Sequence, residues 1–137
     1  MTRLHASVLD GVANDLSSLQ RAVQLQQRAA GVGFDWQQLA PVLAKIREEL
    51  DELEHEIVAA ADSSRQMDEL GDLLFAVANL ARKLGVDPDE ALASTNLKFI
   101  RRFQTVEREL AAQGRSPAGA TLEEMDAIWE RSKSSEP

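Results

Sequence analysis

The sequence lacks cysteine and tyrosine, and it has only four prolines and seven glycines among 137 residues. The absence of cysteine excludes disulfide frameworks, thiol nucleophiles and cysteine-ligated zinc or iron–sulfur sites. No apolar run approaches the ~20 residues of a membrane helix. The first residues also lack the apolar core of a secretory signal, so we expect a cytoplasmic location. An apolar fraction of 44% fits one domain with a buried core.

Acidic residues outnumber basic ones, 23 to 15, which gives a formal net charge of −8. This balance argues against a nucleic-acid coat and against docking on an anionic membrane, because both need a basic surface. The excess is local: residues 45–72 hold ten acids and three bases, and so carry −7 of the total. The acidity therefore needs a local explanation.

Helix signals dominate, and the few glycines and prolines fall between apolar segments of helical period. The pattern predicts helices over about 14–30, 37–61, 64–84, 88–111 and 122–132, with Asp35 as the N-cap of the second. We expect an all-α fold, an antiparallel four-helix-bundle-like domain with an extra C-terminal helix. Residues 1–13 are expected to be a tail or linker, 14–133 the domain and 134–137 a tail.

A helical wheel places acidic residues beside the apolar face of two successive helices. Glu49 and Glu52 border that face on the second helix, and Glu69 and Asp72 border it on the third. If the two helices pack antiparallel, these four carboxylates converge and repel one another unless a cation lies between them. Carboxylate oxygens favour Mg²⁺, with Mn²⁺ as the alternative ion. A solvated acidic surface is the other reading that the wheel leaves open.

A di-iron centre is the competing metal site, because Glu52 and His55 have the Glu-x-x-His spacing. Ferritin-like centres need two such motifs and two further glutamates. The second histidine, His5, lies in the expected tail without that spacing, and His55 points away from the acidic stripe on the wheel. We therefore reject this reading.

Two acidic motifs carry a resemblance to a known family. Residues 48–52 read EExxE, and residues 69–72 read ExxD seventeen residues later. Together with the further matching stretches this pair resembles the MazG family of nucleoside triphosphate pyrophosphohydrolases, in the all-α NTP pyrophosphatase superfamily. The resemblance covers roughly residues 8–133 and is closest to the C-terminal half of two-domain MazG. The further stretches are LQQRAA (25–30), VGFDW (32–36), GDLLF (71–75) and KFIRRF (98–103).

This resemblance implies Mg²⁺-dependent hydrolysis of NTPs or dNTPs between the α and β phosphates, giving NMP and pyrophosphate. Carried over by position, the metal ligands would be Glu49, Glu52, Glu69 and Asp72. Glu48 begins the motif but turns outward on the wheel, so we regard it as a neighbour of the metal ligands that can activate water. The family is generally dimeric, so a homodimer is expected.

Basic residues of the fourth helix are the candidates for contacting phosphate. Lys98 and Arg102 share one edge of that helix, one turn apart. Side chains of this kind can also extend along a core border without binding anything. The resemblance places phosphate-contacting bases here, and Trp129 and Lys133 match positions linked to the nucleotide. Lys45, on the acidic stripe, contacts phosphate or pairs with Glu49 at i,i+4.

The candidates for the nucleobase pocket are less specific: Phe34, Trp36, Asn79 and Asn96 can stack on a base or hydrogen-bond it. Aromatic residues are as often core residues. Phe75 and Ile100 point away from the apolar faces of their helices, which predicts burial against a partner subunit.

The sequence therefore predicts an Mg²⁺-dependent enzyme that hydrolyses NTPs with metal-activated water and cleans nucleotide pools. No arrangement for covalent catalysis is visible in it. The alternatives are a catalytically silent helical module for dimerisation or regulation, and a pyrophosphatase of narrower specificity, acting on dUTP or phosphoribosyl-ATP.

Overall fold

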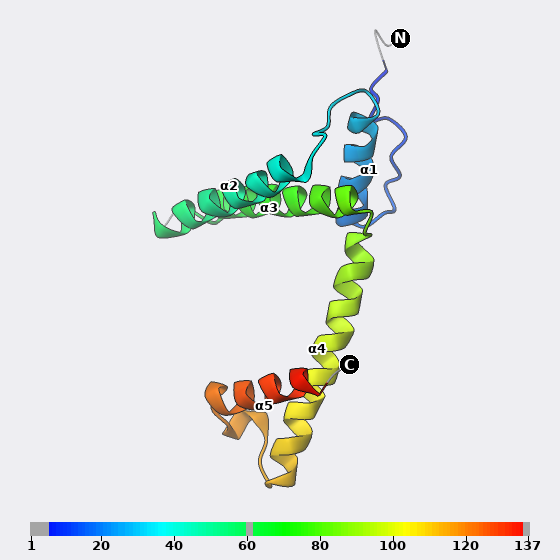
Figure 1. Cartoon of the computed structure of the whole chain (residues 1–137). Coiled ribbons are helices and arrows are strands. Elements are labelled where there is room, and N and C mark those ends of the chain that lie inside the picture. Colours follow the sequence, from blue (N-terminus) through cyan, green and yellow to red (C-terminus); the bar gives the residue numbers. More distant parts are fainter. Residues whose placement is uncertain (1–5, 60–61, 136–137) are drawn as a thin grey trace. The chain divides into compact units, whose positions relative to one another are not determined.

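The computed structural model describes residues 6–59 and 62–135, and within these ranges the protein is helical without a strand (Figure 1). The expected all-α class is confirmed. The chain divides into two compact units, Met1–Ala91 and Leu92–Pro137. The helices are α1 (Ser18–Ala30), α2 (Leu39–Val58), α3 (Ser63–Leu84), α4 (Pro88–Ala112), the short 3₁₀ helix η1 (Pro117–Gly119) and α5 (Leu122–Ser134).

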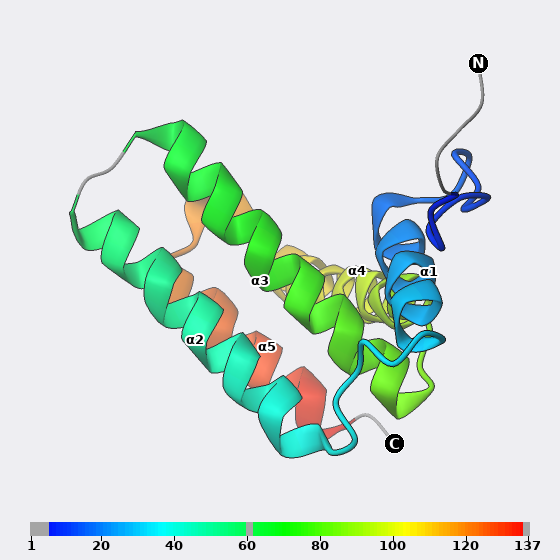
Figure 2. The same cartoon turned by 90° about the horizontal axis from the view of Figure 1, so that it is seen from above.

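In the first unit α3 contacts both other helices, α1 and α2. α2 and α3 lie side by side and antiparallel, and α1 crosses α3 near its C-terminal end (Figure 2). The buried residues of α3, Ala76 and Ala78, are small, which lets the neighbouring helices approach closely. Val42 of α2 is also buried, at 1% exposure. The hairpin of α2 and α3 thus brings the two acidic motifs onto adjacent helices.

Local capping signals explain where most helices begin and end. Ser17 forms a capping box with Gln20, so α1 begins four residues later than the apolar pattern predicted. Asp62 accepts a hydrogen bond from the backbone N–H of Arg65 and caps α3. Gly85 ends α3 in the left-handed region, at φ 70°, a conformation that glycine adopts without strain.

The second helix differs from its prediction at both ends. Its N-cap is Gln38, which makes no side-chain capping bond, so the assignment of Asp35 as the cap was wrong. The helix ends at Val58 with Ala59 as its C-cap. The last two predicted positions, 60–61, lie outside the described residues, as do residues 1–5 of the predicted tail and residues 136–137.

Much of the predicted apolar face of α2 and α3 reaches the surface of the chain. Leu50 is 53% exposed, Leu70 46% and Leu74 48%. Phe75 and Ile100, which we expected to lie off the core faces, are 48% and 49% exposed. The first unit thus buries few large side chains of its own.

The second unit has a separate small core. Val106 and Leu110 of α4 pack with Ile128 of α5, and Phe103 and Trp129 cover them. α5 therefore lies against the C-terminal part of α4 (Figure 1). Among the helices of the described part of the chain, none is long and apolar enough to cross a membrane.

The residues at the start of α5 combine a helix cap with an ion pair. Glu124 accepts from Thr121 in a capping box and also pairs with Arg115, and the Arg115 hydrogen bond is the main cause that lowers the Glu124 pKa to about 2. Since the folded pKa lies below the ordinary value, the ionised carboxylate stabilises the fold above about pH 4.5 and this contribution is lost as the pH falls toward 2. Glu124→Gln keeps a side chain able to complete the box but removes the charge.

We expect the melting temperature of Glu124→Gln to lie below that of the wild type at pH 7, with the difference shrinking between pH 4.5 and pH 2. Calorimetric melts across this range measure it. The exposed neighbour Glu123→Gln is the control, because Glu123 has no ion pair among the described residues. A difference that is independent of pH would contradict the ion-pair explanation.

Candidate metal centre and nucleotide pocket

Three carboxylates of the two acidic motifs converge between α2 and α3. Glu49, Glu69 and Asp72 each offer an oxygen, and the three oxygens lie within 4.8 Å of one another. The side chains differ in burial: Glu49 is buried, Glu69 is half-buried and Asp72 is exposed. The group therefore reaches from the helix interface to the surface, which leaves it open to a ligand from solvent.

The hydrogen bonding of these carboxylates shows whether they fit a divalent cation. Oε2 of Glu49 and Oε2 of Glu69 are both buried without a hydrogen-bond partner in the described structure. Buried carboxylate oxygens without partners are costly unless a cation or a donor satisfies them. An oxygen-only set of this kind suits Mg²⁺ or Mn²⁺. The residues present thus fit a hard divalent cation, although the geometry does not identify the metal.

Glu52 lies beside this triad without belonging to it. The negative charge of Glu49 is the main cause that raises the Glu52 pKa, followed by partial burial and by the charge of Glu69. Glu52 thus lies close enough to Glu49 and Glu69 for their charges to act on it. Within the described residues, however, only the other three carboxylates offer oxygens that lie mutually within 4.8 Å.

Lys45 forms ion pairs on α2 with the two glutamates that begin the EExxE segment. Lys45 lies 3.0 Å from Glu49 and 3.7 Å from Glu48. The Glu49 hydrogen bond is the main cause that raises the pKa of Lys45. Of the two roles predicted for Lys45, the i,i+4 pair with Glu49 is present. Glu48 points outward, with its side chain 56% exposed.

A cavity of about 560 Å³ adjoins the triad, and this volume lies within the usual range of small-molecule sites. Its lining includes Glu49 and Asp72 together with Phe34, Trp36 and Asn79, and Asp72 lies two helical turns before Asn79 on α3. Phe34 is 75% exposed and Trp36 43%, so neither is a core residue. The cavity thus brings together the predicted base-pocket residues of the first unit and two of the predicted metal ligands.

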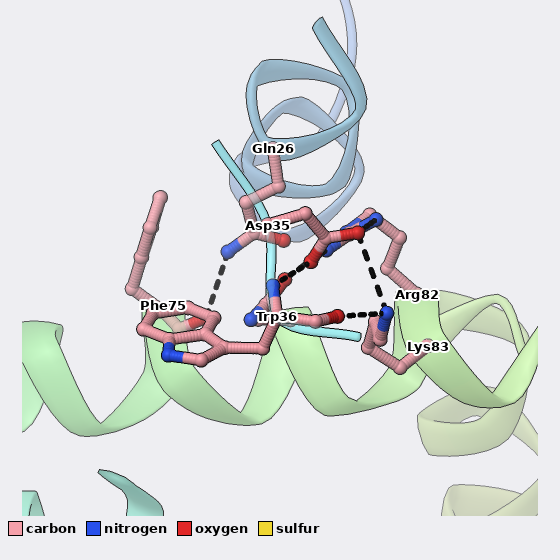
Figure 3. Close-up of polar contacts among 7 residues, drawn as sticks. Gln26, Asp35, Trp36, Phe75, Arg82 and Lys83 are labelled. Atoms are coloured by element: carbon pink, nitrogen blue, oxygen red, sulfur yellow. Dashed lines mark hydrogen bonds and ion pairs between the residues drawn. The ribbon is translucent and has the colours of Figure 1, made fainter. Parts of the chain in front are cut away.

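The loop that carries Phe34 and Trp36 is fastened to the C-terminal end of α3 (Figure 3). Asp35 accepts hydrogen bonds from both terminal nitrogens of Arg82, at 2.7 and 3.3 Å, and lies 3.3 Å from Nζ of Lys83. Lys83 also donates to the carbonyl oxygen of Trp36 at 2.6 Å. The Arg82 hydrogen bond is the main cause that lowers the Asp35 pKa to about 2. Asp35 is therefore ionised at neutral pH and holds the loop in place.

Three polar residues that hold α1 and the Asp35 loop against α3 were not predicted from the sequence: Gln26, Arg82 and Lys83. Nε2 of Gln26 donates to the carbonyl oxygen of Phe75 at 2.9 Å and ties α1 to α3 (Figure 3). The feature of the sequence that could have identified Gln26 is its polar side chain within the apolar period of α1. For Arg82 and Lys83 the sequence offers no local signal, because the loop that they bind lies 47 and 48 residues away.

The remaining predicted residues lie in the second unit. The Arg102 guanidinium lies 5.8 Å from the Trp129 ring centroid, and Trp129 packs at 5.3 Å on Phe99. Lys133 pairs with Glu130 at 3.7 Å. Lys98 is half-buried on α4 and has no ion-pair partner in the described part of the chain, and Asn96 is exposed. Arg102 and Trp129 are thus brought together.

Similarity to known proteins identifies the family of this chain. The model of the MazG nucleotide pyrophosphohydrolase domain matches residues 37–107, just over half of the chain. The chain belongs to the MazG family. The match to the MazG domain includes both acidic motifs and the whole hairpin of α2 and α3.

Two MazG relatives show how far the similarity extends. A nucleoside triphosphate pyrophosphohydrolase of Escherichia coli K12 is 46% identical over 131 residues, which is 95% of this chain and 50% of that protein. A protein of Thermotoga maritima named nucleoside triphosphate pyrophosphohydrolase/pyrophosphatase MazG is 39% identical over 116 residues, 85% of this chain and 44% of the relative. The chain spans about half the length of these relatives, which is compatible with similarity to one half of a two-domain MazG.

The buried contact of Gln26 gives a stability prediction. Gln26→Glu removes the donor and places a carboxylate opposite the Phe75 carbonyl, so we expect the free energy of unfolding to fall by about 1–3 kcal/mol. Urea denaturation measures this change. The exposed neighbour Gln27→Glu is the matched control and should change stability by less than about 0.5 kcal/mol. Equal losses in the two variants would refute the tie between α1 and α3.

Proposed function

We propose that this chain hydrolyses nucleoside triphosphates to NMP and pyrophosphate in a reaction that requires Mg²⁺, and that it serves to clean nucleotide pools in the cytoplasm. One observation carries the proposal. Glu49, Glu69 and Asp72 bring oxygens within 4.8 Å of one another beside a cavity of about 560 Å³. The MazG domain match and the printed names of the relatives support it.

The carboxylate group and the substrate carry the same sign of charge. A triphosphate has about four negative charges near neutral pH and is repelled by bare carboxylates. Glu49, Glu69 and Asp72, with Glu52 beside them, are the residues that would hold a divalent cation. When bound there, the cation supplies charge neutralisation at phosphate oxygens and lowers the pKa of water. The acidic residues thereby become a docking site for a polyanion.

Residues of the chain accept the proton and contact the substrate in this reaction. A water molecule adds to phosphorus, the α–β anhydride bond breaks and pyrophosphate leaves, without a covalent enzyme intermediate. A carboxylate accepts the proton of that water, with Glu48, Glu49 and Glu52 as the candidates. We assign the contacts with phosphate to Lys45, Lys98 and Arg102. Asn96, Trp129 and Lys133 are the further candidates for binding the nucleotide, from the second unit.

The assay that tests this function identifies the products. The full chain is incubated with each NTP and dNTP, with and without Mg²⁺, and the products are separated by chromatography. We expect NMP and pyrophosphate only with the metal, and a loss of at least about 100-fold in kcat/KM for Asp72→Asn, because it weakens the triad.

Glu54→Gln is the matched control, since Glu54 is an exposed acid on the same helix as Glu49. It should retain wild-type turnover. Release of orthophosphate with NDP would refute the cleavage position. Absence of turnover by the folded wild type with Mg²⁺ would refute the function and favour the catalytically silent module.

We also propose that the chain forms a homodimer. The exposed apolar side chains of α2 and α3, such as Leu50, Leu70 and Leu74, support this assignment, because contiguous apolar surface of this kind is costly in water. Size-exclusion chromatography with light scattering should give twice the mass of one chain. Leu70→Glu should shift the protein toward monomer, whereas Leu122→Glu, 74% exposed on α5, should not. A monomeric wild type at micromolar concentration would refute the dimer.

A further inference from the structure

One side chain on the cavity wall has its hydrogen-bonding orientation fixed by a neighbour. Asn79 lines the cavity together with Glu49 and Asp72. Its Oδ1 accepts a hydrogen bond of 3.0 Å from Nε of Arg82. Because a guanidinium has donors and no acceptor, the amide atom that faces it must be the oxygen. The amide nitrogen, Nδ2, is therefore the branch left for another partner.

Nδ2 of Asn79 has two N–H donors to offer. In residues 6–59 and 62–135 no protein group accepts a hydrogen bond from it. Among the described residues, the buried side-chain atoms without a hydrogen-bond partner are Oε1 of Gln26 and Oε2 of Glu49 and Glu69. Nδ2 of Asn79 is not one of these buried atoms. Asn79 thus presents an open donor on a wall of a cavity that a ligand can enter.

Arg82 is itself held in place by Asp35. Both terminal nitrogens of the guanidinium bind the Asp35 carboxylate, which fixes the plane of the group, and Nε then lies toward Asn79. The side chains of Arg82 and Asp35 are only 12% and 19% exposed. A chain of three residues, Asp35, Arg82 and Asn79, therefore holds the amide in one of its two orientations. Figure 3 shows the Asp35–Arg82 part of it.

The position of this donor relative to the carboxylates points to the part of a nucleotide that it meets. This step rests on the proposed function, in which the phosphates lie beside the carboxylates Glu49 and Asp72. Asn79 lines the same cavity two helical turns beyond Asp72 on α3, about 10 Å along the helix axis, so a base that extends along the cavity from the phosphates can reach it. The edge of the base farthest from the ribose carries either an exocyclic carbonyl oxygen, as in uracil, thymine, guanine and hypoxanthine, or an amino group, as in cytosine and adenine.

We propose that Asn79 is a specificity-determining residue whose Nδ2 donates a hydrogen bond to the exocyclic carbonyl oxygen of a keto base, and that Arg82 and Asp35 are positioning residues for it. A donor facing an amino group leaves two donors opposed, which makes the amino bases the poorer substrates. The chain therefore discriminates between two classes of triphosphate through a side chain that lies apart from the acidic motifs.

The test compares pairs of substrates that differ mainly at this position: ITP with ATP, and UTP with CTP. For the wild type we expect kcat/KM to be roughly two- to tenfold higher for the keto member of each pair, the size expected for one neutral hydrogen bond, with the difference residing in KM. Asn79→Leu should bring each ratio close to one. Asn79→Asp replaces the open donor by an oxygen and should invert the ratio.

Arg82→Met tests the positioning role. Without the guanidinium the Asn79 amide can adopt either orientation, so the ratio of kcat/KM for the keto substrate to that for the amino substrate should fall toward one in each pair. Arg65→Met is the matched control, because Arg65 also lies on α3 and also loses an ion pair, that with Glu56. It should leave both ratios at the wild-type value. Circular dichroism of every variant confirms folding.

The failure of this inference is distinguishable from failure of the proposed function. Turnover of all four triphosphates with ratios that stay unchanged in Asn79→Leu and Asn79→Asp would overturn the role of Asn79 and leave the hydrolase intact. A lost preference in Arg65→Met as well as in Arg82→Met would overturn the positioning role. A folded wild type that hydrolyses none of the four would overturn both proposals.

Discussion

Mutual repulsion among carboxylates is the constraint around which the first unit is built. Glu49, Glu69 and Asp72 come from two helices whose packing holds their oxygens within 4.8 Å. Lys45, 3.0 Å from Glu49, offsets part of this repulsion from the same helix. The small buried residues of α3 allow both α1 and α2 to lie close to it. The helix contacts therefore have to outweigh the repulsion until a cation satisfies the buried oxygens.

The net charge of the chain takes on a different meaning once these residues are located. A protein of net negative charge repels polyanions over most of its surface. The ten acids of residues 45–72 are not equivalent, however. Glu54 lies in solvent, whereas Glu49 is buried with an unpartnered oxygen. An unpartnered buried carboxylate oxygen of this kind is costly unless a cation or a hydrogen-bond donor satisfies it.

Local sequence information predicted a large part of this structure. The 3.6-residue period placed Glu49, Glu69 and Asp72 on facing edges because a helix rotates its residues by a fixed angle. The helix ends at Ser17, Gly85 and Thr121 follow from side chains and backbone within a few residues of each end. Arg82 and Lys83 were missed because their role depends on a loop 47 residues away, which no local period reveals. The same limit applies to the exposed leucines of α2 and α3, because periodicity identifies the apolar face of a helix and not the surface that covers it.

The beginning of α2 has a consequence for local dynamics. Gln38 makes no side-chain capping bond. The first backbone N–H groups of α2 therefore lack the side-chain acceptor that Ser17 provides for α1 and Thr121 for α5. The loop before it is held instead by contacts of Asp35 and Trp36 with the end of α3. Amide hydrogens in the first turn of α2 should therefore exchange with solvent whenever this loop detaches, while the remainder of the hairpin stays closed. Detachment of this loop thus opens one side of the cavity beside the carboxylates without unfolding the hairpin of α2 and α3.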